Sequence, residues 1–397
     1  MIVNNAAIAD MDSVQQAEPS RGMPVQRTDF QREVYCILGL PFDALTLVQS
    51  EQRVLAAAAA RQRCFFSTPN LNFLVAARTD APFRDSVLRS DLSLADGMPI
   101  IWIARALGVP LTERVAGSTL FERLRERRRD GSPLRVYLFG GPDGVAAKAA
   151  ERLNAEHGAM QCVGAHSPGF GTIAQLSPPE QIAAINASNA DFLLVALGAQ
   201  RGQAWIEYNL AALNTPVVSH LGAVVNFIAG SVKRAPPRWG ALGLEWLWRI
   251  KEEPALWRRY YRDGVALLGL MAGKVLPGVF AARAARKRIA RAPAPEVELQ
   301  RQGDQVRLVL RGEWHAGALA PLRAACEQLA AQGGDVVLDM AQVDGLDSAT
   351  LGLLLVLLGH QSIAGHGLRI AAISPAARKA IGLGCADYLL QPLARVH

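Results

Sequence analysis

Short apolar runs with the length of buried strands alternate with helical patterns through most of the chain before residue 220. The helical segments, such as residues 50–63 and 145–157, separate the runs along the sequence. This alternation predicts a parallel α/β sheet, in which ligands bind beyond the carboxyl ends of the strands. The predicted strands lie at residues 34–40, 64–67, 135–139, 160–163, 191–197 and 216–219.

A second block of about 100 residues, large enough to be its own domain, follows the segment ARAPAPEVE at residues 290–298. Alternating Ala and Pro in that segment indicate a linker. We expect the second block to be a small α/β domain, with strands at 305–311, 335–339 and 368–373 and helices near 316–331, 348–361 and 375–381. The predicted organisation is a disordered polar leader (1–30), an α/β domain (31–232), a basic aromatic appendage with a helix (233–291) and the second α/β domain (292–397).

Several classes of protein are disfavoured by what the chain lacks. The leader has neither the basic start nor the apolar core of a signal peptide. The five cysteines lie far apart without a C-x-x-C pair, which excludes a disulfide scaffold and fits a reducing compartment. No Walker A, G-x-S-x-G or H-E-x-x-H motif is present, and the single D-x-D triplet, Asp10 to Asp12, lies in the leader. We therefore predict no metal site.

Positive charge is concentrated in residues 233–291, which hold fourteen Lys and Arg against four Asp and Glu. Four of the seven Trp lie in the same segment, which then continues as the apolar run 264–282. Three interpretations compete: association with a membrane surface, a buried interdomain helix, and nucleic-acid binding. Arg and Lys beside Trp and Tyr suit a membrane interface, and no nucleic-acid-binding signature is present. Lys274 and Pro277 inside the run favour an interfacial helix over a true span.

Three turns, two of which follow predicted strands, carry residues suited to ligand binding, and each has a plainer interpretation. Thr68 and Asn70 stand at a helix start, where they suit a phosphate or sugar hydroxyls, or serve as ordinary caps. Asp96 opens an apolar helix, as a general base for an attacking hydroxyl or as an N-cap. Gly140 and Gly141 suit the approach of a pyrophosphate, or form a tight turn, since the spacing is not G-x-G-x-x-G.

Together these segments resemble the WecG/TagA/CpsF family of bacterial glycosyltransferases. The resemblance runs from about residue 34 to residue 261 and includes ILGLPFDALT (37–46), the segment around Thr68 and Asn70, ADG (95–97), ERVAGSTLFERL (113–124), LFGGPDG (138–144) and LLVALG (193–198). Its most specific part lies within residues 221–261, where G-x-x-x-x-F-x-x-G-x-x-K-R-A-P is followed by G-L-E-W-L-x-R-x-x-x-E-P.

The resemblance implies a Rossmann-like glycosyltransferase domain that moves a sugar, with inversion, from a UDP-sugar to a polyprenyl-diphosphate-linked acceptor. Family donors are UDP-N-acetylmannosamine, its uronic acid and UDP-glucose. By position, Asp96 matches the general base of the family, and Thr68 matches its active-site threonine. Cationic side chains would stabilise the departing diphosphate, so the resemblance implies no metal and no other cofactor.

The remaining site residues follow from the same resemblance, which also implies a cytoplasmic protein held peripherally on the inner face of the membrane, with no nucleic-acid partner. The residues expected to bind substrate or nucleotide are Asn70, Gly140, Gly141, Gly198, Gln203, Arg234 and Arg249. Those expected at the membrane or the acceptor are Trp246, Trp248, Arg258 and Arg259.

One loop departs from the family pattern. The family commonly shows L-G-x-P-K-Q-E-x-W, whereas residues 197–205 read LGAQRGQAW, so that Gln200, Gly202 and Gln203 replace Pro, Gln and Glu. If this loop binds the nucleotide, the change alters donor affinity or specificity, or abolishes activity.

The second block resembles a STAS domain, as in anti-sigma-factor antagonists, on residues 336–357 and 365–374. Their pattern D-S-S-G-L-G aligns with residues 347–352, which places Ala349 at the usual phosphoserine position, between Ser348 and Thr350. The resemblance favours a docking module for a protein partner. Two functions therefore stand: an active glycosyltransferase of bacterial surface polysaccharide synthesis, or a catalytically altered transferase domain that acts as a regulatory scaffold through its STAS domain.

Overall fold

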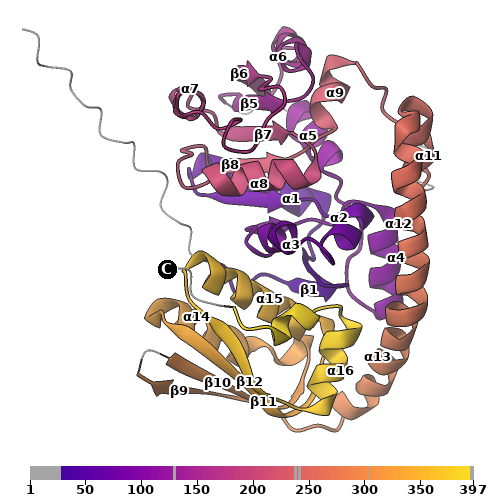
Figure 1. Cartoon of the computed structure of the whole chain (residues 1–397), viewed down its shortest axis with the longest axis vertical. Coiled ribbons are helices and arrows are strands. Elements are labelled where there is room, and N and C mark those ends of the chain that lie inside the picture. Colours follow the sequence, from indigo (N-terminus) through magenta and orange to yellow (C-terminus); the bar gives the residue numbers. More distant parts are fainter. Residues whose placement is uncertain (1–27, 128–130, 237–238, 240–242, 304, 394–397) are drawn as a thin grey trace, which may run out of the picture.

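A parallel sheet of six strands, in the order β4-β3-β8-β7-β5-β6, forms the centre of the first domain. The computed structural model describes residues 28–127, 131–236, 239, 243–303 and 305–393 (Figure 1). The predicted α/β class is confirmed, and the two-residue strand β4 is an addition to the prediction. The strands are β3 (Cys64–Ser67), β4 (Leu92–Ser93), β5 (Leu134–Gly140), β6 (Met160–His166), β7 (Phe192–Ala196) and β8 (Val217–His220).

Helices cover both faces of this sheet because side chains along a strand alternate between the two faces. Phe66 of β3 packs into one hydrophobic cluster with α1, α5, α6 and α9, whereas Phe65 packs into another with α7 and α8. The helices are α1 (Leu47–Ala59), α2 (Leu71–Ala76), α3 (Ala81–Leu88), α4 (Met98–Leu107), α5 (Gly117–Glu126), α6 (Val145–Ala155), α7 (Pro179–Ala187), α8 (Ala199–Asn209) and α9 (Val224–Ala229).

The first predicted strand, residues 34–40, is wrong as a member of the parallel sheet. It forms a separate antiparallel hairpin of β1 (Val34–Ile37) and β2 (Leu40–Asp43). The two turn residues, Leu38 and Gly39, both have positive φ, as a two-residue hairpin turn requires. A Cβ on Gly39 would lie 2.6 Å from the carbonyl oxygen of Cys385, so glycine is also needed for close packing on the second domain.

The second domain has a four-stranded sheet in the order β12-β11-β10-β9, packed against α14, α15 and α16. The predicted linker 290–298 extends too far, because its last residues begin strand β9, which pairs antiparallel with β10. The elements are β9 (Glu296–Gln302), β10 (Gln305–Trp314), α14 (Ala320–Gln332), β11 (Asp335–Leu346), α15 (Ser348–Ile363), β12 (Leu368–Ile373) and α16 (Pro375–Leu383), with short 3-10 turns at Ala316–Ala318 and Asp387–Leu390.

Helix α15 joins the two domains. A Cβ on Gly352 would lie 2.4 Å from the carbonyl oxygen of Val34, and one on Gly359 would lie 2.2 Å from that of Leu88. Phe30 is buried in the same cluster, so the predicted disordered leader ends before it, while residues 1–27 lie outside the described part of the chain. The two domains therefore share a continuous apolar core.

A long helical segment runs along one side of the molecule past both domains (Figure 1). It consists of α11 (Glu245–Glu252), a 3-10 turn (Pro254–Leu256), α12 (Trp257–Leu270), a π-helical turn (Met271–Val275) and α13 (Leu276–Ile289). By length and composition, Pro254–Ile289 is able to cross a membrane, yet only 11% of its most apolar window is buried. The interpretation as a wholly buried interdomain helix is therefore wrong.

Candidate functional site

Asp96 lies in the loop between β4 and α4, at the edge of the sheet where the parallel strands end. Its backbone N–H donates to the carbonyl of Pro69, which follows β3, at 3.0 Å, and the neighbouring Ala95 carbonyl accepts from Val115 N–H at 2.8 Å. Gly97, with φ of 128°, is the N-cap of α4 and makes no side-chain cap bond. The interpretation of Asp96 as the N-cap of the helix that follows it is therefore wrong.

Thr68 and Gly117 lie beside Asp96. Thr68 is buried, and its hydroxyl oxygen lies 3.3 Å from the position that a Cβ on Gly117 would occupy. The backbone N–H of Gly117, the first residue of α5, donates to the Asp96 carboxylate. The structure thus brings the two predicted catalytic residues together at the first turn of α5.

Asn70 fits its plainer interpretation. It is the N-cap of α2, and its side-chain oxygen accepts from Phe73 N–H at 3.3 Å. Its Cβ still lies close to the Asp96 loop, 3.9 Å from the Cβ position of Gly97. Asn70 therefore caps α2 and lies beside the Asp96 loop.

Burial raises the pKa of Asp96 to about 6, and the charges around it adjust that value. Arg114 lowers the pKa, Glu245 raises it, and the Gly117 N–H and Arg249 lower it again. Arg114 and Glu245 form a two-bond ion pair, at 2.7 and 2.9 Å, that joins the loop before α5 to the start of α11. At neutral pH, Asp96 is thus deprotonated and also basic enough to accept a proton from a hydroxyl.

Arg249 of α11 is shared between three neighbours. It donates to Glu253 at 2.8 Å, its guanidinium lies 5.4 Å from the ring centroid of Phe227, and its charge reaches Asp96. The appendage therefore supplies both signs of charge, Glu245 and Arg249, to the environment of the candidate base.

The predicted glycines form tight turns at the same edge. A Cβ on Gly140, which ends β5, would lie 2.6 Å from the carbonyl oxygen of Ala196, so this glycine lets β5 and β7 approach each other. Gly141 faces Val225, whereas no atom lies within 4 Å of the Cβ position of Gly198 before α8. Of the three, Gly198 is the one whose backbone is open to an approaching ligand.

The altered loop places Gln203 inside the protein. Its Nε2 donates to Ser67 Oγ at 2.8 Å, and its Oε1, which is buried, has no partner within the described residues. A Cβ on the neighbouring Gly202 would lie 2.1 Å from the His220 ring, so this imidazole fills the space of a side chain at position 202. Burial lowers the pKa of His220 to about 4, and its Nε2 is also buried and unpaired among the described atoms.

The predicted membrane residues lie on the long helical segment. Trp246 is exposed and packs near Tyr260, with ring centroids 6.2 Å apart. Trp248 donates from its indole to the carbonyl of Lys233 at 3.1 Å. Arg258 lies over Trp257 and Arg259 over Tyr260, at 5.7 and 5.0 Å from the ring centroids. The structure records no contact between these residues and Asp96 within the described chain.

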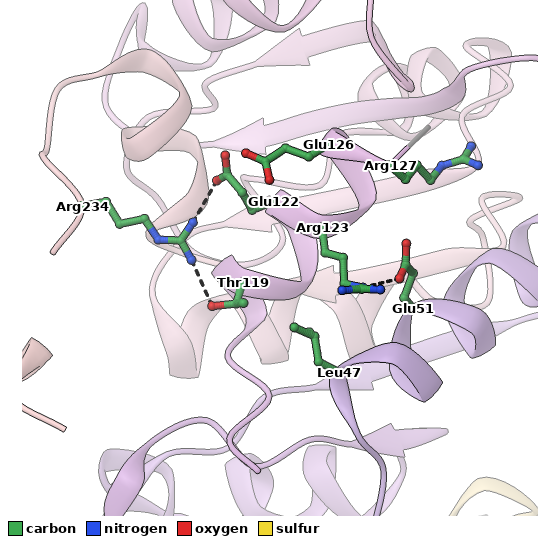
Figure 2. A pocket seen from close by; sticks show the side chains of 8 residues that line it. All are labelled: Leu47, Glu51, Thr119, Glu122, Arg123, Glu126, Arg127 and Arg234. Atoms are coloured by element: carbon green, nitrogen blue, oxygen red, sulfur yellow. Dashed lines mark hydrogen bonds and ion pairs between the residues drawn. The ribbon is translucent and has the colours of Figure 1, made fainter. Parts of the chain in front are cut away.

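Arg234 binds helix α5 from the loop that leads to the appendage (Figure 2). It donates to Glu122 at 2.9 Å and to Thr119 at 3.0 Å. It lines a cavity of about 560 Å³, in which Glu51 also pairs with Arg123. Because three carboxylates and three guanidinium groups balance there, this cavity has no net charge to attract a diphosphate. Its lining residues are Leu47, Glu51, Thr119, Glu122, Arg123, Glu126, Arg127 and Arg234.

Sequence reasoning missed four residues that the structure places at this edge. Arg114 and Gly117 stand in the quoted segment ERVAGSTLFERL, and Glu245 stands in GLEWL, so the motifs contained the signal without assigning roles. His220 had no motif signal. Within the described residues, no group of three or more His, Cys, Asp or Glu is arranged to hold a metal ion.

Comparison with known proteins finds relatives of both domains. A relative, the N-acetylglucosaminyldiphosphoundecaprenol N-acetyl-beta-D-mannosaminyltransferase of Bacillus spizizenii, is 31% identical over 180 residues, which cover 45% of this chain and 67% of the relative. The solved structure of an anti-sigma factor antagonist from Mycobacterium paratuberculosis is 21% identical, and the match covers 24% of this chain and 83% of that chain. The solved structure of Mglu is 24% identical, and the match covers 25% of this chain and 27% of that chain. Their TM-scores, 0.23 and 0.18, are too low to bear on the fold.

Two family models match successive parts of the chain. The glycosyl transferase WecG/TagA/CpsF family matches residues 35–278, which include Asp96, Thr68 and the start of the long helix. The Mlab, STAS domain matches residues 297–390. Because the first match spans more than half of the chain, the protein belongs to the WecG/TagA/CpsF family of glycosyltransferases and carries a STAS domain after the transferase domain.

Proposed function

We propose that the protein transfers an N-acetylmannosamine-type sugar, its uronic acid or glucose from a UDP-sugar to a polyprenyl-diphosphate-linked acceptor, with inversion, in bacterial surface polysaccharide synthesis. The observation that carries the proposal is the Asp96 site, where a carboxylate of raised pKa lies beside Thr68 and the Arg114–Glu245 pair. The name of the Bacillus relative supports a mannosaminyl transfer to a lipid-linked diphosphate acceptor.

In the proposed reaction, Asp96 removes the proton from the acceptor hydroxyl as its oxygen attacks the anomeric carbon of the donor. The new C–O bond forms as the bond between the sugar and the diphosphate breaks, and UDP leaves with the bonding electrons. Thr68 and Gly117 confine the attacking oxygen near Asp96. We propose that the departing negative charge is met by arginines of the appendage, namely Arg249, whose charge acts on Asp96, and Arg258 and Arg259 further along the chain, so that no metal is required.

The long helix supports docking on the cytoplasmic face of a membrane. An exposed apolar stripe runs along it at helical spacing. Basic residues accompany the stripe at both ends: Arg258, Arg259 and Arg262 lie among its first residues, and Arg283, Arg286 and Lys287 follow its last residue. Such a helix binds anionic headgroups through its flanks and acyl chains through its stripe. The stripe consists of Trp257, Tyr261, Val265, Leu268, Leu276 and Phe280.

A transfer assay with full-length protein tests the enzymatic proposal. The assay offers a panel of UDP-sugars and a short-chain polyprenyl-diphosphate acceptor, with and without a chelator, and uses D96N as the variant. We expect sugar transfer from one donor, at a rate that the chelator does not change. In D96N this rate should fall by about 10²–10⁴-fold, as expected for the loss of a general base. No transfer from any donor, by folded protein, would overturn the proposal in favour of the regulatory scaffold.

A vesicle assay tests the membrane part separately. We expect the protein to sediment with vesicles that contain an anionic lipid and to be released by salt. Replacing Leu268 and Phe280 of the stripe by Ser should weaken this binding without changing transfer to a water-soluble acceptor. Equal binding of the variant and the wild type would refute the role of the stripe.

A further inference from the structure

The long helix is held from two sides. On the transferase side, Asn72 of α2 donates to Asp263 at 3.1 Å, and Leu270 and Val275 are buried in the cluster that contains α4. On the STAS side, the Lys274 ammonium donates to the carbonyl of Gly382 at 2.6 Å, and Arg288 donates to both oxygens of Glu313 at 3.0 and 3.1 Å. The helix therefore bridges the two domains.

The contact at Glu313 is specific, because this carboxylate is 4% exposed and belongs to β10 in the core of the STAS sheet. A buried carboxylate needs an opposite charge, and Arg288 of α13 provides one. A Cβ on the neighbouring Gly345 would lie 2.3 Å from Glu313 Oε1, so the carboxylate has little room to turn elsewhere.

The STAS domain is in turn fixed on the transferase domain through helix α15 and the turn that contains Tyr388. Ser348, at the start of α15, donates to the carbonyl of Cys36 in β1 at 2.8 Å, and Thr350 is fully buried. Tyr388 donates to the carbonyl of Gly39 in the same hairpin at 2.7 Å. The surface that carries Ser348 thus faces this chain's own transferase domain.

We propose that the STAS domain acts within its own chain as a brace, which holds the long helix in the position that the acceptor side of the transferase requires. Arg288 and Lys274 are the positioning residues at its far end. At the near end, the same helical segment carries Glu245, whose pairing with Arg114 shapes the field at Asp96. The consequence for catalysis rests on the proposed function, whereas the mechanical consequence does not.

Two measurements on full-length protein test the brace. The first is amide hydrogen exchange over residues 254–289. The second is the KM for a polyprenyl-diphosphate acceptor in vesicles of phosphatidylglycerol and phosphatidylcholine, beside the KM for the donor. The variants are R288Q and K274M, with R288K as the conservative replacement. R378Q is the matched control, since Arg378 is exposed on α16 of the STAS domain and has no charged partner among the described residues.

We expect faster exchange in residues 276–289 of R288Q and K274M, and a rise of about two- to fivefold in the KM for the acceptor, the size of effect typical of a partly exposed ion pair. The KM for the donor and the kcat should stay unchanged, R288K should restore most of the loss, and R378Q should match the wild type. K274M leaves Glu313 paired, so it tests the brace even if R288Q unfolds the STAS domain.

If R288Q and K274M both showed the wild-type rate of amide hydrogen exchange and the wild-type KM for the acceptor, the brace would be overturned. Wild-type protein that transfers no sugar would instead overturn the proposed function, while the exchange measurement would still decide on the brace.

Discussion

The pH dependence of transfer follows from the environment of Asp96. A general base acts only when deprotonated, so activity rises with pH through its pKa, which burial raises to about 6. Asp96 would be about 91% deprotonated at pH 7 and about 9% at pH 5, so kcat/KM should fall roughly tenfold between them. A carboxyl group with an ordinary pKa near 3.9 would lose less than about a tenth of its activity over the same range.

Replacing Glu245 by Gln provides the sharper test, because it changes the field without touching the base. Glu245 raises the pKa of Asp96 and also engages Arg114, which lowers it. Removing the carboxylate therefore acts twice in the same direction, and we expect the acid limb to move down by about one pH unit. E252Q, about two turns further along α11, is the control.

The measurement is kcat/KM against pH from 4.5 to 8.5, with stability checked at each pH by thermal unfolding. If the acid limb of the wild-type kcat/KM profile lay near pH 4, the argument that burial raises the pKa of Asp96 would be refuted. A limb that moves to higher pH in E245Q would refute the assigned electrostatics, even if Asp96 remained the base.

Three substitutions of glycine test the packing. G202A places a Cβ 2.1 Å from the His220 ring and should lower the free energy of unfolding by about 1–3 kcal/mol. The double variant G202A/H220A should lose less free energy of unfolding than the sum of the losses in the two single variants. G359A places a Cβ 2.2 Å from the Leu88 carbonyl oxygen and should weaken the joint between the domains by a similar amount. Gly269 lies on the exposed helix, and no atom lies within 4 Å of the position that a Cβ there would occupy. G269A should therefore raise the free energy of unfolding by about 0.5–1 kcal/mol. Denaturant unfolding measures all of them, and a G202A or G359A protein as stable as the wild type would contradict the close contacts.

The elements that the sequence predicted are those with strong local signals. Five of the six predicted runs became strands of the parallel sheet, since four or more apolar residues between helical patterns have few other uses. The errors have local causes as well. Strand β4 has two residues, too few for a pattern, and the pair Leu38 and Gly39 turned a predicted strand into a hairpin.

The candidate site divides in the same way. The sequence placed Thr68 after a predicted strand, where a parallel sheet gathers its ligand-binding residues, whereas β4, the strand before Asp96, was not predicted. The motifs assigned no role to Arg114 or Glu245, which are 131 residues apart in the chain and meet only because the appendage returns to the sheet.

The sequence by itself determined the α/β class, the family motifs and the concentration of positive charge in the appendage, because each is a property of neighbouring residues. Only the tertiary structure decided the pKa of Asp96, the packing of His220 against Gly202, and the burial of α15 between the domains. These three features depend on which surfaces meet and on how much water is excluded between them. Hydrophobic periodicity in the sequence predicts that one face of an element is buried, but it does not predict which other element covers that face.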